Sequence, residues 1–251
     1  MTGLMANDVV VELGGAPVLK GVSFAVDAGE FVAVVGPNGA GKTTLLSCLA
    51  GELRPVSGSI ELAGSDPGAM SVPDRARARA YLVQSDRRDV PYDVATVVGF
   101  GTHLSALEVD DRNHVVDACL RIMEIEHLAS RPVSSLSGGE RRRVAIARVL
   151  AQDNGVLILD EPTDSLDLAH ADLVMSVASA RARAGDVVVT SSHDLNLAAK
   201  HADRVVVLRD GVVVARGSAQ EVFTDALLSE VYECRVSVIE HPDDGRPVIF
   251  L

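Results

Sequence analysis

The chain has 251 residues, of which 47% are apolar and 23% charged, a composition that excludes intrinsic disorder and fibrous repeats. Its 23 Lys and Arg against 35 Asp and Glu give a net charge of −12, so we expect no nucleic-acid partner. Three cysteines without metal-binding spacing predict neither a disulfide framework nor a zinc site, and they favour a reducing compartment.

No long apolar segment stands at the start of the chain or within it. Residues 1–11 include Asp8 and lack the basic start and apolar stretch of a secretory signal. The apolar runs are strand-length, well short of the roughly 18 residues that a membrane helix needs. We therefore expect a cytoplasmic protein whose role at a membrane would be peripheral.

The first third of the sequence predicts strands that lead into a helix. Residues 9–13 and 22–26 are short β-rich runs, and 31–35 is a continuous apolar strand of the buried kind. Residues 44–50 have the apolar spacing of a helix, and a strand follows at 59–62.

The loop between that buried strand and that helix reads GPNGAGKT and matches the phosphate-binding pattern GxxxxGK[ST]. Its glycines permit positive φ, so that backbone N–H groups can face phosphate oxygens at a helix N-terminus. Lys42 is expected to reach the β- and γ-phosphates, and the Thr43 hydroxyl to bind Mg²⁺. A glycine-rich surface turn is the alternative, which the flanking strand and helix disfavour. The expected ATP contacts are Gly36, Pro37, Asn38, Gly39, Ala40, Gly41, Lys42, Thr43 and Thr44.

Residues from about 86 onward mix charge with helical periodicity. The pattern is clearest at 110–128, where an Asp110-Asp111 cap precedes one apolar face. Residues 94–104 also have the spacing of a packed helix. The sequence thus predicts a helical insertion whose apolar face in 110–128 holds Val115, Cys119, Ile122 and Met123.

Strands return after the insertion. Residues 156–159 and 187–190 are apolar and each follows a helix-like segment, which predicts a parallel sheet with right-handed crossovers. Asp210-Gly211 marks a hairpin that completes the sheet.

The last part of the chain predicts a helix at 219–233 and a short β tail at 236–239 and 248–250. The predicted division is a nucleotide-binding core with an N-terminal β subdomain at 1–84 and 151–218, a helical subdomain at 85–150, and a C-terminal extension at 219–251.

Two carboxylates follow the strand at 156–159. Asp160 and Glu161 stand at its C-terminal end, where open α/β sheets bind ligands. Adjacent side chains at a strand end point in different directions, so Asp160 is expected to hold Mg²⁺ while Glu161 acts as general base. An ordinary acidic turn before Pro162 is the alternative.

Residues 136–140 read LSGGE ahead of that strand, and with this segment the chain resembles the ATPase subunit of ATP-binding cassette (ABC) transporters over about residues 9–217. Gln84 matches the family's glutamine loop, 165–167 its D-loop and His193 its switch histidine. The resemblance implies an α/β fold, a P-loop NTPase core with a mixed sheet and an inserted helical subdomain. It also implies ATP hydrolysis by Glu161, His193 and Gln84, a D-loop contact from Asp167, and a Mg²⁺ site at Thr43, Gln84 and Asp160.

The LSGGE segment can bind an anion, because a serine and two glycine amides at a helix N-terminus form a second anion-binding surface. In the family this surface binds the ATP held by the opposite subunit, so the resemblance implies an ATP-dependent homodimer. A helix-capping turn is the compatible structural alternative. The residues expected to face the partner's ATP are Ser137, Gly138, Gly139 and Glu140.

Three local features complete this expectation. Leu13 stands where the family commonly has an aromatic ring against adenine, so we expect weaker contact with the base. Glu140 replaces the usual glutamine and adds charge. The run at 141–143, three arginines, is interpreted as a solvated helix face.

The resemblance further implies integral-membrane permease subunits as partners, docked within about 85–107 on the cytoplasmic face of the membrane, and indirectly a substrate-binding protein outside it. The sequences of segments 161–170 and 193–199 are similar to those of the ATPases of haem, ferric siderophore and cobalamin importers. Haem is the cargo that we expect first. An ABC ATPase that acts on nucleic acid and a P-loop kinase are the alternatives. The net charge disfavours the first, and the LSGGE segment disfavours the second.

Overall fold

The computed structural model describes residues 2–84, 91–105 and 107–251. Its centre is a six-stranded sheet in the order β5-β6-β7-β3-β8-β9. The strands from β5 to β8 run parallel, and β9 pairs antiparallel with β8, so the mixed sheet that the family resemblance implies is confirmed. Its strands are β3 (Phe31–Val35), β5 (Ala80–Leu82), β6 (Val156–Leu159), β7 (Val187–Ser192), β8 (Arg204–Arg209) and β9 (Val212–Gly217).

A second sheet of three antiparallel strands has the order β2-β1-β4, from β1 (Thr2–Leu13), β2 (Ala16–Asp27) and β4 (Ser57–Leu62). The first two strands are longer than the apolar runs predicted, because the tight turn at Gly14-Gly15, with φ of +59° and +82°, pairs them along their whole length. A separate hairpin joins β10 (Ser237–Glu240) and β11 (Pro247–Phe250), where the sequence predicted a β tail.

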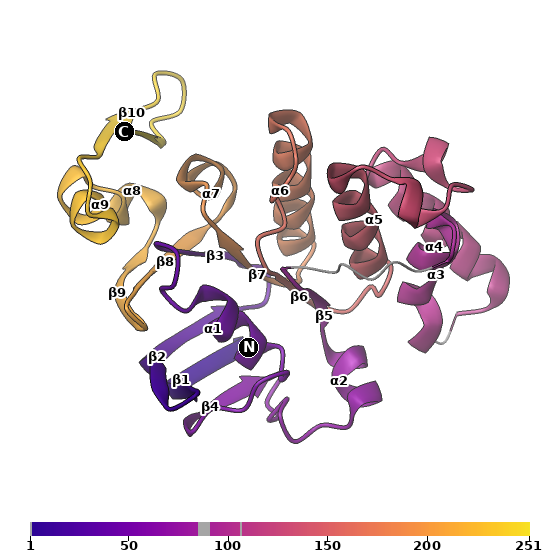
Figure 1. Ribbon diagram of the computed structural model, residues 1–251, viewed down its shortest axis with the longest axis horizontal. Coiled ribbons are helices and arrows are strands. Elements are labelled where there is room, and N and C mark those ends of the chain that lie inside the picture. The colour runs from indigo at the N-terminus through magenta and orange to yellow at the C-terminus, as the bar shows by residue number, and fades with distance from the viewer. Residues whose placement is uncertain (1, 85–90, 106) are drawn as a thin grey trace.

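Helices cover both faces of the six-stranded sheet (Figure 1). On one face, α1 (Lys42–Leu49) lies with the three-stranded sheet, and on the other lie α6 (Leu168–Arg183) and α7 (Leu195–His201). Strand β3 explains this layering. Its alternate residues Val32 and Val34 join the core around α1, whereas Ala33 and Val35 join the core around α7.

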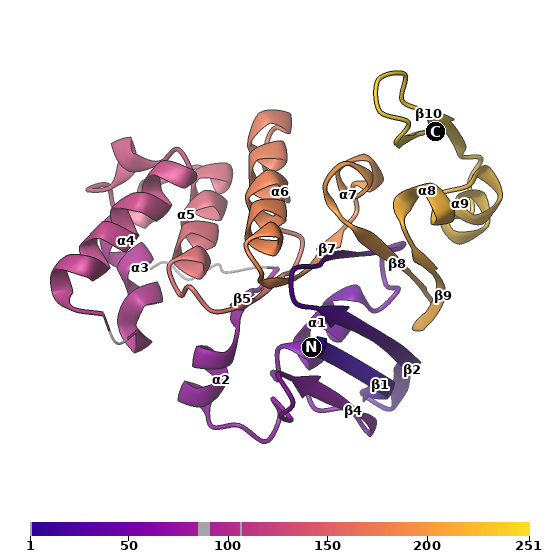
Figure 2. The ribbon, with the colours of Figure 1, turned by 180° about the vertical axis from the view of Figure 1, so that it is seen from behind.

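The remaining helices gather at the two ends of the sheet. Figure 2, seen from behind, shows α3 (Val94–Gly99), α4 (Val109–Ile122) and α5 (Gly138–Leu150) at one end, and α8 (Ala219–Val222) and α9 (Asp225–Tyr232) at the other. Short 3₁₀ turns at Phe100–Leu104, Glu126–Leu128 and Val133–Ser135 lie between α3, α4 and α5 along the chain. Helix α2 (Val72–Ala78) lies between β4 and β5. Within the described residues, no helix combines the length and apolar character needed to cross a bilayer.

Helix α4 corrects one prediction. Its N-cap is Glu108, so Asp110 and Asp111 lie inside the first turn and do not cap the helix. The apolar face predicted at Val115, Cys119, Ile122 and Met123 is wrong in part, since Ile122 is 44% exposed. Both stripes have helical spacing, and packing of α4 against α3 and α5 selects the one that is buried: Val116, Cys119, Leu120 and Met123.

The prediction for the C-terminal region is also wrong in part. The single helix predicted at 219–233 is two helices, because Phe223 leaves helical geometry with ψ of 91° and Thr224 begins a new helix. The Thr224 hydroxyl accepts a hydrogen bond from the backbone N–H of Leu227 at 3.2 Å, the usual role of threonine at an N-cap.

Candidate functional site

The phosphate loop stands between a fully buried strand, β3, and helix α1. Gly36, Gly39 and Gly41 have φ of +149°, +81° and +102°, which side-chain-bearing residues rarely adopt. A Cβ on Gly36 would also lie 2.0 Å from the carbonyl oxygen of Leu208. Backbone conformation therefore favours glycine at all three positions, and close packing on β8 also requires it at Gly36.

Lys42 folds back over this loop. Its Nζ donates to the carbonyl oxygens of Gly36 at 2.8 Å and Pro37 at 3.1 Å, and the residue is only 5% exposed. Burial lowers the pKa of Lys42, while the nearby carboxylates of Glu161 and Asp160 oppose that shift. The ammonium group is thus held at the loop, where phosphate oxygens could take the place of the two carbonyls.

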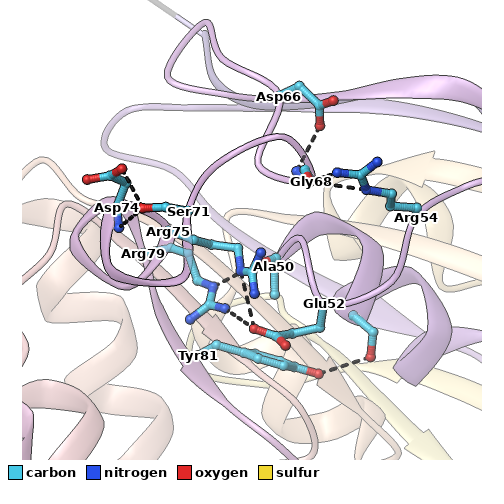
Figure 3. Close-up of polar contacts among 11 residues, drawn as sticks. Ala50, Glu52, Arg54, Asp66, Gly68, Ser71, Asp74, Arg75, Arg79 and Tyr81 are labelled. Carbon is cyan, nitrogen blue, oxygen red and sulfur yellow. Dashed lines mark hydrogen bonds and ion pairs between the residues drawn. The ribbon is translucent and has the colours of Figure 1, made fainter.

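The far end of α1 is tied to β5 by a polar cluster, shown in Figure 3. Arg79 is 7% exposed, and its Nε donates a hydrogen bond to the carbonyl of Ala50 at 2.9 Å. Its Nη2 donates to Glu52 Oε1. Its guanidinium lies 5.4 Å from the ring centroid of Tyr81, whose hydroxyl contacts Ser47 Oγ at 3.2 Å. This cluster orients α1 against the strand that leads to Gln84.

Asp160 is fully buried at the end of β6. Its Oδ1 accepts hydrogen bonds from Ser191 Oγ at 2.6 Å and from Thr43 Oγ1 at 3.3 Å. Its Oδ2 is also buried and has no hydrogen-bond partner within the described part of the chain. Burial raises the pKa of Asp160, and the bonds from Ser191 and Thr43 oppose that rise.

Glu161 and Gln84, from separate strand ends, meet beside this aspartate. Glu161 has a φ of +47°, and its backbone N–H donates to Ser191 Oγ at 2.8 Å. Gln84 Nε2 donates to Glu161 Oε2 at 2.8 Å. A carboxylate, an amide and the exposed His193 are thereby gathered at the carboxyl ends of parallel strands.

These groups open onto one cavity of about 700 Å³. Most of its lining was predicted from the sequence, and Asp160 lies just beneath it. Val18 also lines it, whereas Leu13 is not among the lining residues and is 47% exposed, so the expected contact of Leu13 with adenine is not supported. The lining residues are Val18, Asn38, Gly39, Gly41, Lys42, Thr43, Thr44, Gln84, Glu161 and His193.

Among the described residues that line this cavity, none belongs to the segment 137–140. This segment forms a capping box at the start of α5: Ser137 N–H donates to Glu140 Oε2 at 2.7 Å and Glu140 N–H to Ser137 Oγ at 3.3 Å. The bond from the Ser137 backbone lowers the pKa of Glu140. A Cβ on Gly139 would lie 3.1 Å from the carbonyl oxygen of Ser165, so the D-loop packs closely on this segment.

Asp167 caps helix α6 by accepting from the backbone N–H of His170 at 2.9 Å, and it also contacts the His170 ring at 2.8 Å. Both interactions lower the pKa of Asp167. Helix capping, the structural alternative stated for the LSGGE segment, is therefore present there, and Asp167 of the D-loop also caps a helix.

The interpretation of 141–143 as a solvated face holds for Arg141, which is exposed, and is wrong for the two arginines that follow it. Arg142 and Arg143 are each 8% exposed. Arg142 donates to backbone carbonyls at the ends of β5 and β6, and Arg143 donates to the carbonyls of Met123 at 3.1 Å and Glu124 at 3.2 Å. Charge alone suggested solvent, whereas the clustering of backbone carbonyl oxygens, which only the fold reveals, provides acceptors for both guanidinium groups inside the protein.

Comparison with known proteins decides the family. The family model described as ABC transporter matches residues 19–164, more than half of the chain. The chain belongs to the ABC transporter family. It is an ATPase of that family, which binds adenine nucleotide and couples its hydrolysis to transport.

Relatives and a solved structure extend this assignment. The chain is 47% identical to the hemin import ATP-binding protein HmuV of Streptomyces coelicolor, over 97% of this chain and 88% of that protein. It is 46% identical to HmuV of Nocardia farcinica, over 98% and 88%. A dimeric post-hydrolysis state of the ATP-binding cassette MJ0796 bound to ADP and Pi is similar with a TM-score of 0.77 and 26% identity, over 86% of this chain and 98% of that one.

Proposed function

We propose that this ATPase is the ATP-hydrolysing subunit of a haem importer. The observation that carries the catalytic part is the cavity in which Lys42, Gln84, Glu161 and His193 meet beside the phosphate loop. Support for haem as cargo comes from relatives named for hemin import at 47% and 46% identity. Importers of ferric siderophores or cobalamin are the alternative cargo class.

In the proposed site, the loop from Gly36 to Thr44 binds the phosphates of ATP. Helix α1 directs its N-terminus at them, and Lys42 supplies a positive charge beside the β- and γ-phosphates. Val18 supplies apolar contact at the rim of the cavity. The site therefore binds nucleotide through its phosphates more than through its base.

The residues present fit Mg²⁺. Asp160 buries an oxygen, Oδ2, that lacks a hydrogen-bond donor among the described residues, and Thr43 Oγ1 lies next to the other carboxylate oxygen. Hard oxygen donors of this kind, completed by phosphate oxygens, suit magnesium. Thr43 and Asp160, with Gln84 as the third expected ligand, would hold the ion, which would neutralise phosphate charge.

Glu161 is proposed as the general base, because its carboxylate faces the cavity and can accept a proton from an attacking water. His193 would orient that water and contact the γ-phosphate. Gln84 Nε2 donates a hydrogen bond to Glu161 Oε2. An attacking water bound by Glu161 would compete with Gln84 for this carboxylate, so the position of the Gln84 side chain would depend on whether that water is present.

The dimer is proposed from the division of the site. Ser137, Gly138, Gly139 and Glu140 stand apart from the cavity lining of their own chain, so they would face the ATP of a second copy. Leu168, beside the D-loop Asp167, is 86% exposed, which suits an apolar contact with that copy. Support for such a pair comes from the dimeric cassette bound to ADP and Pi.

Import requires cargo to cross a membrane, so integral-membrane permease subunits are the proposed partners on the cytoplasmic face, with a substrate-binding protein outside. The expected docking region at 85–107 includes 85–90 and 106, which lie outside the described residues. The described part, α3 and the turn that follows, presents Phe100 at 48% exposure. We also propose the division of the chain into a nucleotide-binding core, a helical subdomain and a C-terminal extension with the bounds predicted from the sequence.

Affinity purification from membranes tests this assignment, followed by reconstitution of the recovered complex in vesicles. We expect a permease to co-purify and ATP-dependent uptake of haem to exceed uptake of a ferric siderophore or cobalamin. Recovery of ribosomes or nucleic acid in place of a permease would refute the transport partner. A permease that moves only a siderophore or cobalamin would overturn haem while leaving the ATPase assignment intact.

A further inference from the structure

We propose that Arg142 is a positioning residue that ties helix α5 to the catalytic Glu161 and Gln84 of its own chain. This inference rests on the proposed function, because it assigns a task within the hydrolytic site. Through Arg142, the helix that begins with the LSGGE segment and the residues that act on water and γ-phosphate would move as one unit.

The contacts of the Arg142 guanidinium carry the inference. One nitrogen, Nη1, donates to the carbonyls of Val83 at 3.0 Å and Gln84 at 3.2 Å. The other, Nη2, donates to the carbonyls of Asp160 and Glu161, both at 2.6 Å. A further bond runs from Nε to the carbonyl of Pro162 at 3.3 Å. One side chain therefore spans two chain segments that are about 75 residues apart and that both supply the site.

These bonds suit a positioning role because they reach backbone and not side chains. A guanidinium has a planar fork of donors, and charge-assisted bonds to carbonyl oxygens are short and directional. They hold the main chain of Gln84 and Glu161 in place while leaving both side chains free to act in the cavity. Arg142 itself is 8% exposed and is not among the described residues that line the cavity.

The conformation of Glu161 is a second, independent observation. Its φ of +47° is unfavourable for a residue with a side chain and persists only where neighbours enforce it. The enforcing bonds lie on both sides of the residue: Ser191 accepts from its N–H at 2.8 Å, and Arg142 donates to its carbonyl. The Glu161 carbonyl also accepts from the backbone N–H of Asp164 at 3.1 Å. Loss of Arg142 would remove from this set the one bond that comes from helix α5.

Arg142 also lies five residues after Ser137, about one and a half helical turns along α5. A shift of the LSGGE segment on meeting the partner's ATP would therefore reach Glu161 and Gln84 through a single rigid helix and one guanidinium. In this way each chain's catalytic groups would respond to the nucleotide bound by the other.

Arg143 provides a matched control. It is the next residue on the same helix, is equally buried, and donates to backbone carbonyls at Met123 and Glu124, within the helical group. Neither acceptor belongs to the catalytic site. Arg142→Gln and Arg143→Gln thus remove the same kind of buried guanidinium with different connections.

The test measures kcat and KM for ATP, nucleotide binding and thermal unfolding for the full-length wild type and both variants. Because misplacing a catalytic group by about 1 Å can cost about 100-fold in rate, we expect Arg142→Gln to lower kcat at least about tenfold. KM and nucleotide binding should stay within about threefold, because the phosphate loop is untouched. Arg143→Gln should lower thermal stability to a similar degree while keeping kcat within about twofold.

Chemical rescue separates positioning from general loss of structure. With Arg142→Ala, added guanidinium ion at millimolar concentration should restore part of kcat, whereas an equal concentration of sodium should not. If Arg142→Gln fails to fold, Arg142→Lys, which keeps the charge but loses the fork, takes its place with the same expected fall in kcat.

The inference is overturned if the Arg142 variants keep kcat within about twofold of wild type, or if the Arg143 variant loses as much kcat at equal thermal stability. It is also overturned if the loss lies only in KM. These outcomes leave the proposed function standing. A wild-type protein without ATPase activity would instead overturn the proposed function and this inference together.

Discussion

Ser191 Oγ donates a hydrogen bond to Asp160 Oδ1 at 2.6 Å and so places a neutral donor against a carboxylate that is fully buried. The bond compensates only one of the two carboxylate oxygens, since Oδ2 lacks a hydrogen-bond partner among the described residues. Without a cation, the nucleotide-free protein thus maintains a charge in an environment that disfavours it. Such unfavourable burial is common where a site is prepared for a ligand.

This arrangement predicts that Asp160→Asn stabilises the nucleotide-free protein at neutral pH while removing its response to Mg²⁺. The amide fills the same volume without a charge to bury, so we expect a higher urea midpoint. In the presence of ATP, added Mg²⁺ should raise the midpoint of wild type but not of the variant. Equal responses of the two proteins to Mg²⁺ would remove Asp160 from the metal site.

The pH dependence of that difference has a definite sign. Burial raises the pKa of Asp160 above its ordinary value of 3.8, so the carboxyl group ionises first in the unfolded chain. Its contribution to stability is complete below pH 3.8 and is lost as pH rises through the higher, folded-state pKa. The advantage of Asp160→Asn in urea unfolding should therefore grow from acidic to neutral pH and then level off. An advantage that shrinks over this interval would contradict the sign.

Lys42→Ala is expected to abolish nucleotide binding or turnover. The Nζ of Lys42 is the positive charge placed by the loop, and no other lysine lines the cavity within the described residues. A fluorescent ATP analogue measured by anisotropy gives the affinity, which should fall by at least about tenfold if a charge-assisted contact worth about 1.5–3 kcal/mol is lost. Lys20→Ala, at an exposed position on β2, is the control and should bind as wild type. Ordinary ATPase rates in Lys42→Ala would count against the loop assignment.

Glu161→Gln should stop hydrolysis and let ATP hold two copies together. The amide keeps the size of the side chain but cannot accept the proton of an attacking water, so kcat should fall at least about 100-fold. Light scattering after size-exclusion chromatography with Mg²⁺-ATP should then show a dimer, and addition of Ser137→Arg on the same chain should return it to monomers. If Glu161→Gln stays monomeric with ATP, the two-chain site is incorrect.

Arg79→Met should lower stability without abolishing nucleotide binding. The change removes the bond to the carbonyl of Ala50 and the contact with Glu52, which would cost about 1–3 kcal/mol of unfolding free energy for the buried acceptor. Urea unfolding measures this loss of unfolding free energy. Arg77→Met is the control, since its ion pair with Asp74 lies on the surface and is worth about 0–1 kcal/mol. Equal losses in the two variants would show that the cluster in Figure 3 does not stabilise α1.

Much of the site was predictable because its parts are local. A buried strand, a glycine-rich loop and a helix N-terminus form a phosphate cradle from residues 31–49 alone, and each glycine is required by a backbone angle within that segment. The carboxylates after β6 likewise follow from the position of a strand end. The roles given to the LSGGE segment across a second chain stay predictions.

Other features were decided only by packing between distant segments. The sequence allows two apolar stripes on α4, and contact with α3 and α5 chooses one. It marks three arginines as charged, but Arg142 becomes buried because the carbonyls at the ends of β5 and β6 converge where its side chain lies.

Sequence by itself determined the phosphate loop, the acidic strand end and the alternation of strands and helices, since each depends on spacing over a few residues. Tertiary structure alone decided that Ser191 supports Asp160, that Gln84 contacts Glu161, and that Val18, not Leu13, lines the cavity. The physical reason is that burial and hydrogen-bond partners depend on which surfaces meet in space, and residues as far apart as 84 and 161 meet only once the sheet has formed.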